Sequence, residues 1–187
     1  ITVNGMTPHA AREARAYGYV FQAAGLFPWR TIGRNVTLPL EIMGYPAAER
    51  AERCRKVLEL VELAGFEKKY PWQLSGGMQQ RASIARALAF DADLLLMDEP
   101  FGALDEIVRD RLNEELLALW ARTGKTIAFV THSIPEAVYL STYVAITELL
   151  MGGCTTSMDH MYVHPRPFLI DAQFRAAREI GFRFYAT

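Results

Sequence analysis

Two acidic side chains end a fully apolar run at residues 93–99 (DLLLMDE). An apolar run bounded by acids predicts a parallel strand that is buried on both faces. The carboxyl end of such a strand is the edge at which open α/β sheets bind ligands. There Asp98 could hold Mg²⁺, mostly through water, and Glu99 could orient or deprotonate a water molecule. Taken alone, the same two residues are equally compatible with a strand end whose acids are solvated.

A serine and two glycines stand before a predicted helix, within residues 74–81 (LSGGMQQR). Two adjacent glycines allow a ligand to approach the backbone without meeting a Cβ atom. The free N–H groups at the start of a helix then attract anions, and Ser75 could donate its hydroxyl to a phosphate. Taken alone, Ser75, Gly76 and Gly77 are more simply explained as a helix cap with a flexible entry.

Two further polar residues end predicted strands. His132 follows residues 126–130 (TIAFV), and Gln22 follows residues 18–21 (GYVF). A lone histidine is more often structural than catalytic, and a lone glutamine at a strand end is an ordinary solvated residue. Taken singly, these two residues therefore indicate no function, and only their order along the chain with the other motifs does.

The elements that must position these residues alternate between helix and strand. Apolar residues at helical spacing predict helices over residues 47–63, 77–90 and 106–122, with Gly65 and Gly124 at helix ends. Because the strands between them are apolar, we expect an α/β fold in which the strands pair in parallel.

The remaining segments are predicted from weaker signals. Residues 23–35 are expected to form a loop, and a helix that begins near Pro135 is expected to lead into a third strand at residues 143–146. A last helix over residues 171–180 and a last strand over residues 182–186 are expected near the C-terminus.

Composition excludes several classes of protein. The chain has 187 residues with 20 basic and 21 acidic side chains, so no charge excess favours binding to nucleic acid or anionic lipid. No apolar run approaches the roughly 18–20 residues that cross a bilayer, and no secretory signal is visible. Cys54 and Cys154 lack the spacing of a disulfide scaffold or a zinc knuckle, which favours a reducing cytoplasm.

Four features occur in the order of the ATPase subunit of ABC transporters: Gln22, the turn Ser75-Gly76-Gly77, the pair Asp98-Glu99, and His132. The resemblance extends over residues 1–146. Residues 74–81 resemble the family signature, residues 94–99 the Walker B strand and residues 103–105 (ALD) the D-loop. The resemblance implies a P-loop NTPase domain with parallel strands and a helical subdomain.

The resemblance assigns a role to each residue. Asp98 and Gln22 would coordinate Mg²⁺, and Gln22 would also sense the membrane subunit. Glu99 would polarise the attacking water, and His132 would contact the γ-phosphate. In a head-to-tail dimer, the ATP site of the opposite subunit would be completed by Ser75, Gly76, Gly77 and Gln79, and Asp105 would contribute through the D-loop. In this chemistry the protein mainly positions groups and offsets charge on the transferred phosphoryl group.

Residues 26–29 (LFPW) and 100–105 (PFGALD) resemble bacterial importers of the nitrate, sulfonate and taurine group, which includes importers of pyrimidine precursors. That resemblance implies ATP and Mg²⁺ as cofactors and a peripheral place on the inner face of the cell membrane. The implied partners are a permease at the Q-loop region, a second ATPase subunit and, indirectly, a solute-binding protein. Phe27 and Trp29 could meet the coupling helix of the permease or pack inward. Only residues 23–73 lie between Gln22 and the signature, which disfavours the coiled-coil relatives that act on DNA.

The family pattern also requires a phosphate-binding loop, G-x-x-x-x-G-K-[ST], upstream of Gln22. The first lysine of this sequence is Lys56, so no such loop precedes Gln22. We expect that the chain begins inside the domain, that its true start lies upstream, and that most ATP affinity is lost without the loop.

The C-terminal residues follow a different pattern. Residues 147–162 and 171–187 resemble metal-dependent amidohydrolases of the 8-oxoguanine and chlorotriazine deaminase branch, where this stretch is one helix–strand unit of a (β/α)₈ barrel. Three polar residues could suggest a metal site: Asp159, His160 and His164. We assign no metal to them, because Pro165 and Pro167 break any helix that would align them.

These patterns predict two parts, a truncated ABC ATPase domain at residues 1–146 and an amidohydrolase-like fragment at residues 147–187. Three interpretations follow. The chain is part of an ATPase that drives an importer of a small anion or a pyrimidine-like solute, a remnant of a deaminase-type hydrolase, or an inactive fusion product. An ATPase predicts hydrolysis of Mg-ATP that Glu99→Gln abolishes, whereas a hydrolase predicts bound zinc or iron, which we do not expect.

Overall fold

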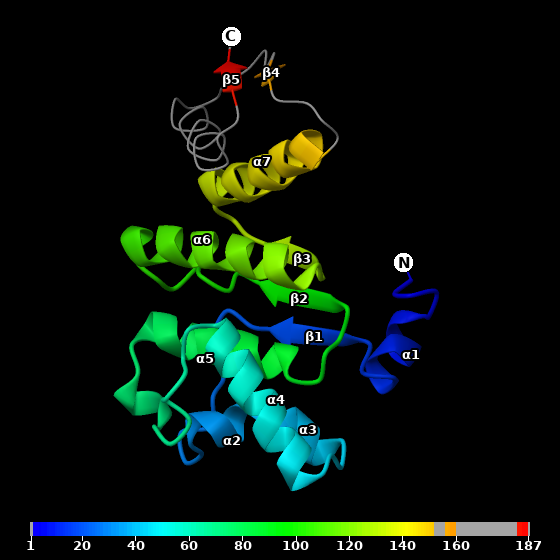
Figure 1. Cartoon of the computed structure of the whole chain (residues 1–187), viewed down its shortest axis with the longest axis vertical. Coiled ribbons are helices and arrows are strands. Elements are labelled where there is room, and N and C mark those ends of the chain that lie inside the picture. The colour runs from blue at the N-terminus through cyan, green and yellow to red at the C-terminus, as the bar shows by residue number, and fades with distance from the viewer. Residues whose placement is uncertain (1, 152–155, 160–182, 187) are drawn as a thin grey trace. The chain divides into compact units, whose positions relative to one another are not determined.

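The computed structural model describes residues 2–151, 156–159 and 183–186 (Figure 1). The chain forms two compact units, Ile1–Val130 and Thr131–Thr187. The first unit contains α1 (Pro8–Glu13), β1 (Tyr17–Val20), α2 (Ile32–Val36), α3 (Leu38–Ile42), α4 (Ala47–Leu60), the 3₁₀ helix η1 (Pro71–Gln73), α5 (Gly76–Leu88), β2 (Leu94–Asp98), α6 (Glu106–Thr123) and β3 (Thr126–Val130). The second unit contains α7 (Ile134–Met151), β4 (Thr156–Asp159) and β5 (Arg183–Ala186). Within the described ranges, every helix is too short or too polar to span a membrane.

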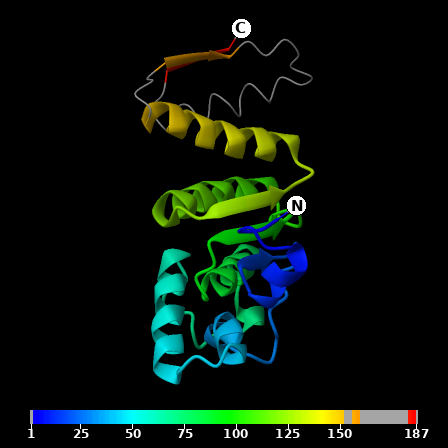
Figure 2. The same cartoon turned by 90° about the vertical axis from the view of Figure 1, so that its right-hand side faces the viewer.

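The first unit is built on a three-stranded parallel sheet. The strand order is β1-β2-β3, and Leu95 of the central strand is in register with Gly18 on one side and Ile127 on the other. The three arrows run side by side in the same direction (Figures 1 and 2). The prediction of an α/β fold with parallel pairing is therefore confirmed.

Strand β3 is less buried than its apolar sequence, residues 126–130, indicates. Exposure alternates along β3, and Val130 is 57% exposed. The physical reason is the position of β3 at the edge of this sheet, whereas β2 lies between two strands and buries Leu95 and Met97 almost completely. An apolar run alone does not distinguish a central strand from an edge strand.

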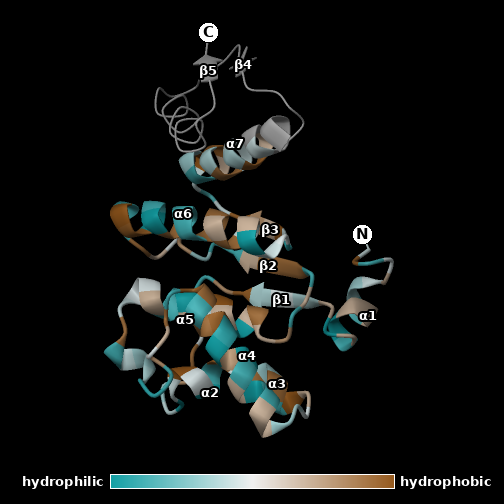
Figure 3. Cartoon of the chain, in the orientation of Figure 1, coloured by the Kyte–Doolittle hydropathy of each residue, from teal (hydrophilic) through white to brown (hydrophobic). Residues whose placement is uncertain are grey.

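The core lies between the sheet and the helices of the first unit. Leu58 of α4, Leu88 of α5 and Leu112 of α6 all join one apolar cluster with Leu95 of β2. Hydrophilic and hydrophobic residues share the surfaces of α4 and α6 (Figure 3). These helices therefore pack through one face and leave the other to solvent.

Two helix boundaries differ from the prediction. Residues 23–35 were expected to be loop throughout, but α2 begins at Ile32, because the side chain of Thr31 accepts a hydrogen bond from the Arg34 N–H and caps the helix. Helix α4 ends at Leu60 instead of continuing to residue 63. Glu62 takes a left-handed conformation (φ 57°) and ends the helix before Gly65 is reached.

The second unit contains the largest error of the prediction. Residues 143–146, which were expected to form a strand, lie inside the continuous helix α7. No glycine or proline interrupts the chain from Glu136 to Met151, so nothing ends the helix that begins at Ile134. The predicted boundary between two parts at residue 146 also falls within α7, and that boundary stays a prediction.

The last strand is confirmed, since β5 occupies Arg183–Ala186 and pairs in parallel with β4. The predicted helix at residues 171–180 lies outside the described residues, as do His160 and His164. The amidohydrolase-like fragment therefore stays a prediction.

Strand β1 approaches helix α5 closely at Gly18. We expect Gly18→Ala to lower the free energy of unfolding by about 1–3 kcal/mol. A Cβ atom there would lie 2.6 Å from the Ala87 carbonyl oxygen and 2.8 Å from Leu95 Cδ2, so strand and helix would have to separate. Urea unfolding measures the loss.

The matched control is Gly77→Ala, whose Cβ would meet no backbone atom but only Val108 Cγ1 at 3.2 Å and Leu112 Cδ1 at 3.7 Å. Alanine also favours the helical conformation, so we expect this change to alter stability by less than about 1 kcal/mol. Equal losses for Gly18→Ala and Gly77→Ala would contradict the close approach of β1 to α5.

Candidate functional site

Three of the predicted site residues come together at the carboxyl edge of the sheet. Gln22 Nε2 donates a hydrogen bond to Glu99 Oε2 at 3.2 Å. Asp98, the last residue of β2, is exposed and accepts a hydrogen bond from Tyr19 Oη at 3.4 Å. They meet because β1 and β2 are parallel neighbours, with Val20 beside Met97, so both strands end at the same edge. We call Gln22, Asp98 and Glu99 the edge cluster.

The backbone of Glu99 adopts an uncommon conformation. Its φ is 44°, in the left-handed region, which costs a residue with a side chain about 1–2 kcal/mol. Its N–H donates to the Val130 carbonyl oxygen at 2.8 Å, which continues the pairing of β2 with β3. The chain turns sharply at this residue, and the carboxylate contacts Gln22. Strained residues of this kind occur preferentially at functional sites.

Two neighbours of the edge cluster were not among the predicted site residues. Burial, and then the carboxylate of Asp98, raise the pKa of the Tyr19 phenol, so it stays protonated as a donor to Asp98. A Cβ atom on Gly102 would lie 3.3 Å from Gln22 Nε2 and 3.4 Å from Glu99 Oε2. Glycine at this position therefore leaves room for the contact between Gln22 and Glu99.

The predicted phosphate-binding turn forms the start of α5. The Ser75 hydroxyl accepts a hydrogen bond from the Met78 N–H at 3.3 Å, so the capping role of Ser75 is confirmed. The side chain of Gln79 donates to the Leu74 carbonyl oxygen at 3.1 Å. Ser75 itself is exposed, and the N-terminal end of α5 therefore faces solvent with its positive dipole end.

The two glycines of this turn pack against the segment that precedes α6. A Cβ atom on Gly76 would lie 3.2 Å from Leu104 Cδ2, and one on Gly77 would lie 3.2 Å from Val108 Cγ1. Asp105 caps α6 by accepting a hydrogen bond from the Val108 N–H at 3.0 Å. The start of α5 and the start of α6 thus lie together. We call Ser75, Gly76, Gly77 and Gln79 the signature end of α5.

His132 belongs to the second unit, in the residues that precede α7, and it is exposed. The backbone around it is held by Thr131, whose hydroxyl donates to Glu136 Oε2 at 2.5 Å and accepts from the Ser133 N–H at 3.0 Å. These contacts fix the turn that carries the histidine.

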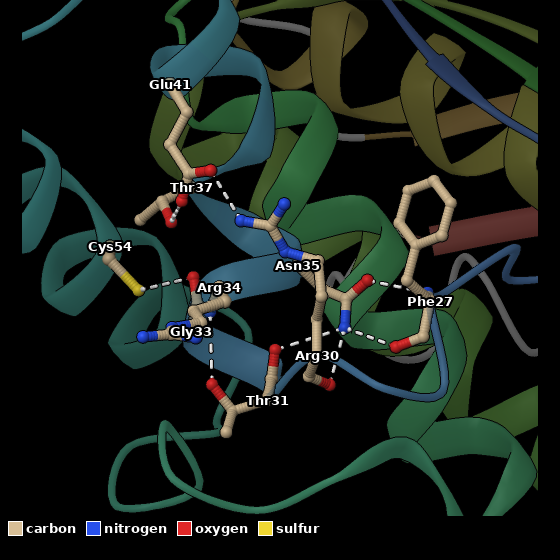
Figure 4. A network of polar contacts seen from close by, with 9 residues as sticks. All are labelled: Phe27, Arg30, Thr31, Gly33, Arg34, Asn35, Thr37, Glu41 and Cys54. Atoms are coloured by element: carbon tan, nitrogen blue, oxygen red, sulfur yellow. Dashed lines mark hydrogen bonds and ion pairs between the residues drawn. The ribbon is translucent and has the colours of Figure 1, made fainter.

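A buried asparagine holds the loop that follows Gln22 (Figure 4). Asn35 Oδ1 accepts a hydrogen bond from the Phe27 N–H at 2.7 Å. Its Nδ2 donates to the carbonyl oxygens of Phe27, Arg30 and Thr31 at 3.1, 3.0 and 3.1 Å. The loop presents Trp29, which is 72% exposed and lies 5.2 Å from the Phe27 ring between centroids. Trp29 does not pack inward.

An ion pair fastens the same loop to α3. Arg30 Nη2 lies 2.5 Å from Glu41 Oε2, and the Thr37 hydroxyl donates to Glu41 Oε1 at 3.2 Å (Figure 4). Burial alone would raise the pKa of Glu41, but the hydrogen bonds and charge of Arg30 outweigh it and lower the pKa of this carboxyl. Glu41 is therefore ionised at neutral pH.

Comparison with known proteins decides the family. The family model described as "ABC transporter" matches residues 1–102, which is more than half of the chain and includes the edge cluster and the signature end. The chain belongs to the ABC transporter family. His132 lies beyond that match.

Curated members of the ABC transporter family are similar over most of the chain. A taurine import ATP-binding protein of Pseudomonas entomophila is 50% identical over 146 residues, which cover 78% of this chain and 56% of the relative. An uncharacterised ABC transporter ATP-binding protein of Methanocaldococcus jannaschii is 55% identical over 129 residues, which cover 69% of this chain and 48% of the relative. The chain spans about half the length of the curated relatives it matches.

Solved structures of the same family share the fold. A component of an ABC transporter complex from Clostridium perfringens aligns with a TM-score of 0.65 at 25% identity, covering 72% of this chain and 54% of that chain. A dimeric ATP-binding cassette in a post-hydrolysis state with ADP and Pi aligns with a TM-score of 0.58 at 34% identity, covering 73% and 64%. The α/β architecture with a parallel sheet and flanking helices is thus that of ABC ATPase domains.

Proposed function

We propose that this chain is part of the ATP-binding subunit of an ABC importer and that the edge cluster is its hydrolytic centre. The contact between Gln22 and Glu99, beside Asp98 at the carboxyl edge of a parallel sheet, is the observation that carries the proposal. Two carboxylates and an amide at this edge suit the positioning of a metal-bound phosphate and a water molecule.

The edge cluster fits Mg²⁺ by the chemistry of its donor atoms. Mg²⁺ prefers carboxylate and amide oxygens and keeps several of its own waters, so one or two protein ligands are sufficient. Asp98 offers an exposed carboxylate. The amide nitrogen of Gln22 donates to Glu99, so the amide oxygen is the atom of Gln22 that would face the ion.

In this proposal each residue of the site has a separate role. Asp98 and Gln22 hold the cation, which when bound offsets charge on the phosphates. Glu99 accepts a hydrogen bond from the attacking water and orients it, and His132 contacts the γ-phosphate. The hydrogen bond from Gln22 holds the Glu99 carboxylate at the edge of the sheet.

The signature end of α5 serves a second site. Its exposed Ser75 hydroxyl and the N–H groups of the first turn suit phosphate oxygens. We propose that Ser75, Gly76, Gly77 and Gln79, with Asp105 nearby, complete the ATP site of a second subunit in a head-to-tail dimer. The similarity to an ATP-binding cassette solved as a dimer supports this arrangement.

The relatives support a proposal for the partner and the solute. Similarity to taurine import ATP-binding proteins supports an importer of a small anion such as a sulfonate. In this proposal the chain lies at the inner face of the cell membrane, against a transmembrane permease and, indirectly, a solute-binding protein. The exposed Trp29 and Phe27 on the loop after Gln22 are the side chains that we propose meet the permease.

The proposal is tested by phosphate release from ATP. We expect the 187-residue chain alone to release no phosphate above the buffer blank, because no phosphate-binding loop precedes Gln22 in its sequence. A hybrid should hydrolyse Mg-ATP when residues 1–146 replace the segment that they match in the taurine import ATP-binding protein of Pseudomonas entomophila.

The hybrid supplies the phosphate-binding loop from the relative, so its activity depends on the residues of this chain for the rest of the site. A folded hybrid that binds ATP but fails to hydrolyse it would contradict the proposed function. Rapid hydrolysis by the chain alone would contradict the expected need for the loop.

A further inference from the structure

Helix α5 holds the backbone on both sides of Gln22. Before Gln22, Gln80 Nε2 donates a hydrogen bond to the Phe21 carbonyl oxygen at 3.0 Å. After Gln22, Arg86 Nη2 and Nη1 donate to the carbonyl oxygens of Ala24 and Gly25 at 2.8 and 2.7 Å. The segment that carries Gln22 is thus fastened at two points to one helix.

Both donors are held in place within the protein. Gln80 is only 3% exposed, so its amide has little freedom to leave the Phe21 carbonyl. Burial lowers the pKa of Arg86, but an arginine guanidinium stays charged at neutral pH. Its Nη2 also donates to the hydroxyl of the fully buried Ser83 at 3.3 Å. A charged fork with three acceptors fixes its orientation better than a single hydrogen bond.

The side chain of Gln22 itself is exposed, and Glu99 accepts the hydrogen bond from its amide. A held backbone places the Gln22 side chain within reach of Glu99, and it removes backbone conformations that would otherwise compete with a single 3.2 Å contact. Gln80 and Arg86 provide that restraint from a helix that belongs to the core.

We propose that Gln80 and Arg86 are positioning residues that hold the amide of Gln22 against Glu99. This inference rests on the proposed role of Gln22 at the edge cluster. Gln80 and Arg86 lie on the same helix as the signature end, and Arg86 is about 16 Å along the axis from Ser75 at 1.5 Å per residue. A shift of α5 would therefore displace Gln22 from Glu99 together with the signature end.

The test follows the NMR signals of the Gln22 side-chain amide in the full chain, which are assigned by their loss in Gln22→Ala. Glu99→Ala shows where these signals lie when the side chain that accepts their hydrogen bond is lost. We expect Arg86→Met and Gln80→Met to move the signals to that same position. The backbone signals of β2 should stay in place, which shows that the variants fold.

The control is Arg55→Met on the exposed face of α4, which should leave the Gln22 signals unchanged. Signals that keep their wild-type positions in both folded α5 variants would overturn the proposal. A role in stability alone would lower the unfolding midpoint without moving the Gln22 amide.

Mn²⁺ provides a second readout that separates this inference from the proposed function. Mn²⁺ should broaden the Gln22 signals in the wild type and not in Asp98→Asn, and Arg86→Met should need about 10-fold more Mn²⁺ for the same effect. Absence of Asp98-dependent broadening in the wild type would refute the metal role of the edge cluster. The amide positions would still decide whether Gln80 and Arg86 hold Gln22.

Discussion

Glu99→Gln should lower ATP hydrolysis by about 100-fold or more in the hybrid that carries residues 1–146, while ATP binding persists. Glutamine has the same shape as glutamate but carries no charge, so it cannot accept a proton from water or polarise it. The amide can still bond to Gln22, because the side-chain oxygen of either residue can accept the hydrogen bond. The substitution should therefore lower the rate constant of hydrolysis. Phosphate release and fluorescent-nucleotide binding, measured side by side, check this.

Two controls make the result specific. Glu114→Gln removes a charge from an exposed position on α6 and should leave hydrolysis unchanged. Asp98→Asn should raise the Mg²⁺ concentration that half-maximal activity requires, because it alters a cation ligand instead of the group that orients water. If Glu99→Gln kept hydrolysis within a few-fold of the wild type, the assignment of Glu99 would be wrong.

The edge cluster was predictable because the rule that locates it is local. A fully apolar run ending in two acids indicates a buried parallel strand, and parallel strands end at a common edge. Gln22 and Asp98 end neighbouring strands, and the structure places them accordingly. Ser75 as the cap of α5 was also available from the sequence, since capping depends on residues three positions apart.

The residues that support the cluster were not predictable, because their contacts join distant parts of the chain. Gln80 reaches the carbonyl of Phe21, 59 positions away, and no local pattern of polar residues marks that contact. The sequence around Tyr19 predicts a strand in either case, whether the tyrosine hydroxyl contacts Asp98 or solvent. The strand predicted at residues 143–146 failed for a related reason, because β-branched and aromatic residues also continue a helix when nothing ends it.

The loop that follows Gln22 depends on one side chain. We expect Asn35→Ala to lower the free energy of unfolding by about 3 kcal/mol, because it leaves the Phe27 N–H and three carbonyl oxygens without their common partner. Asn35 is fully buried, so water does not readily replace these hydrogen bonds. Urea unfolding measures the loss. With Trp72 and Trp120 replaced by phenylalanine, so that Trp29 is the one tryptophan of the sequence, faster depolarisation of its fluorescence should show that the loop has become mobile in the folded protein.

Asn35→Asp should cost still more than the alanine substitution. Its Oδ1 could keep the hydrogen bond from the Phe27 N–H, but the second oxygen would face three carbonyl oxygens where Nδ2 now donates. A buried carboxylate with one oxygen facing only acceptors must take up a proton, or the loop must move away from it. We therefore expect the stability deficit of Asn35→Asp to grow as the pH rises above the usual pKa of an aspartate, near 4.

The matched control is Asn113→Ala on α6. Asn113 is also almost fully buried, but its Oδ1 has no hydrogen-bond partner within the described part of the chain. Its removal deletes an acceptor that is already unsatisfied, so the free energy of unfolding should fall less than in Asn35→Ala. The depolarisation of Trp29 fluorescence should stay unchanged. Equal losses at the two positions would mean that burial of an asparagine, and not the four hydrogen bonds of Asn35, sets the stability. In that case the loop carrying Phe27 and Trp29 would owe its conformation to the ion pair of Arg30 with Glu41.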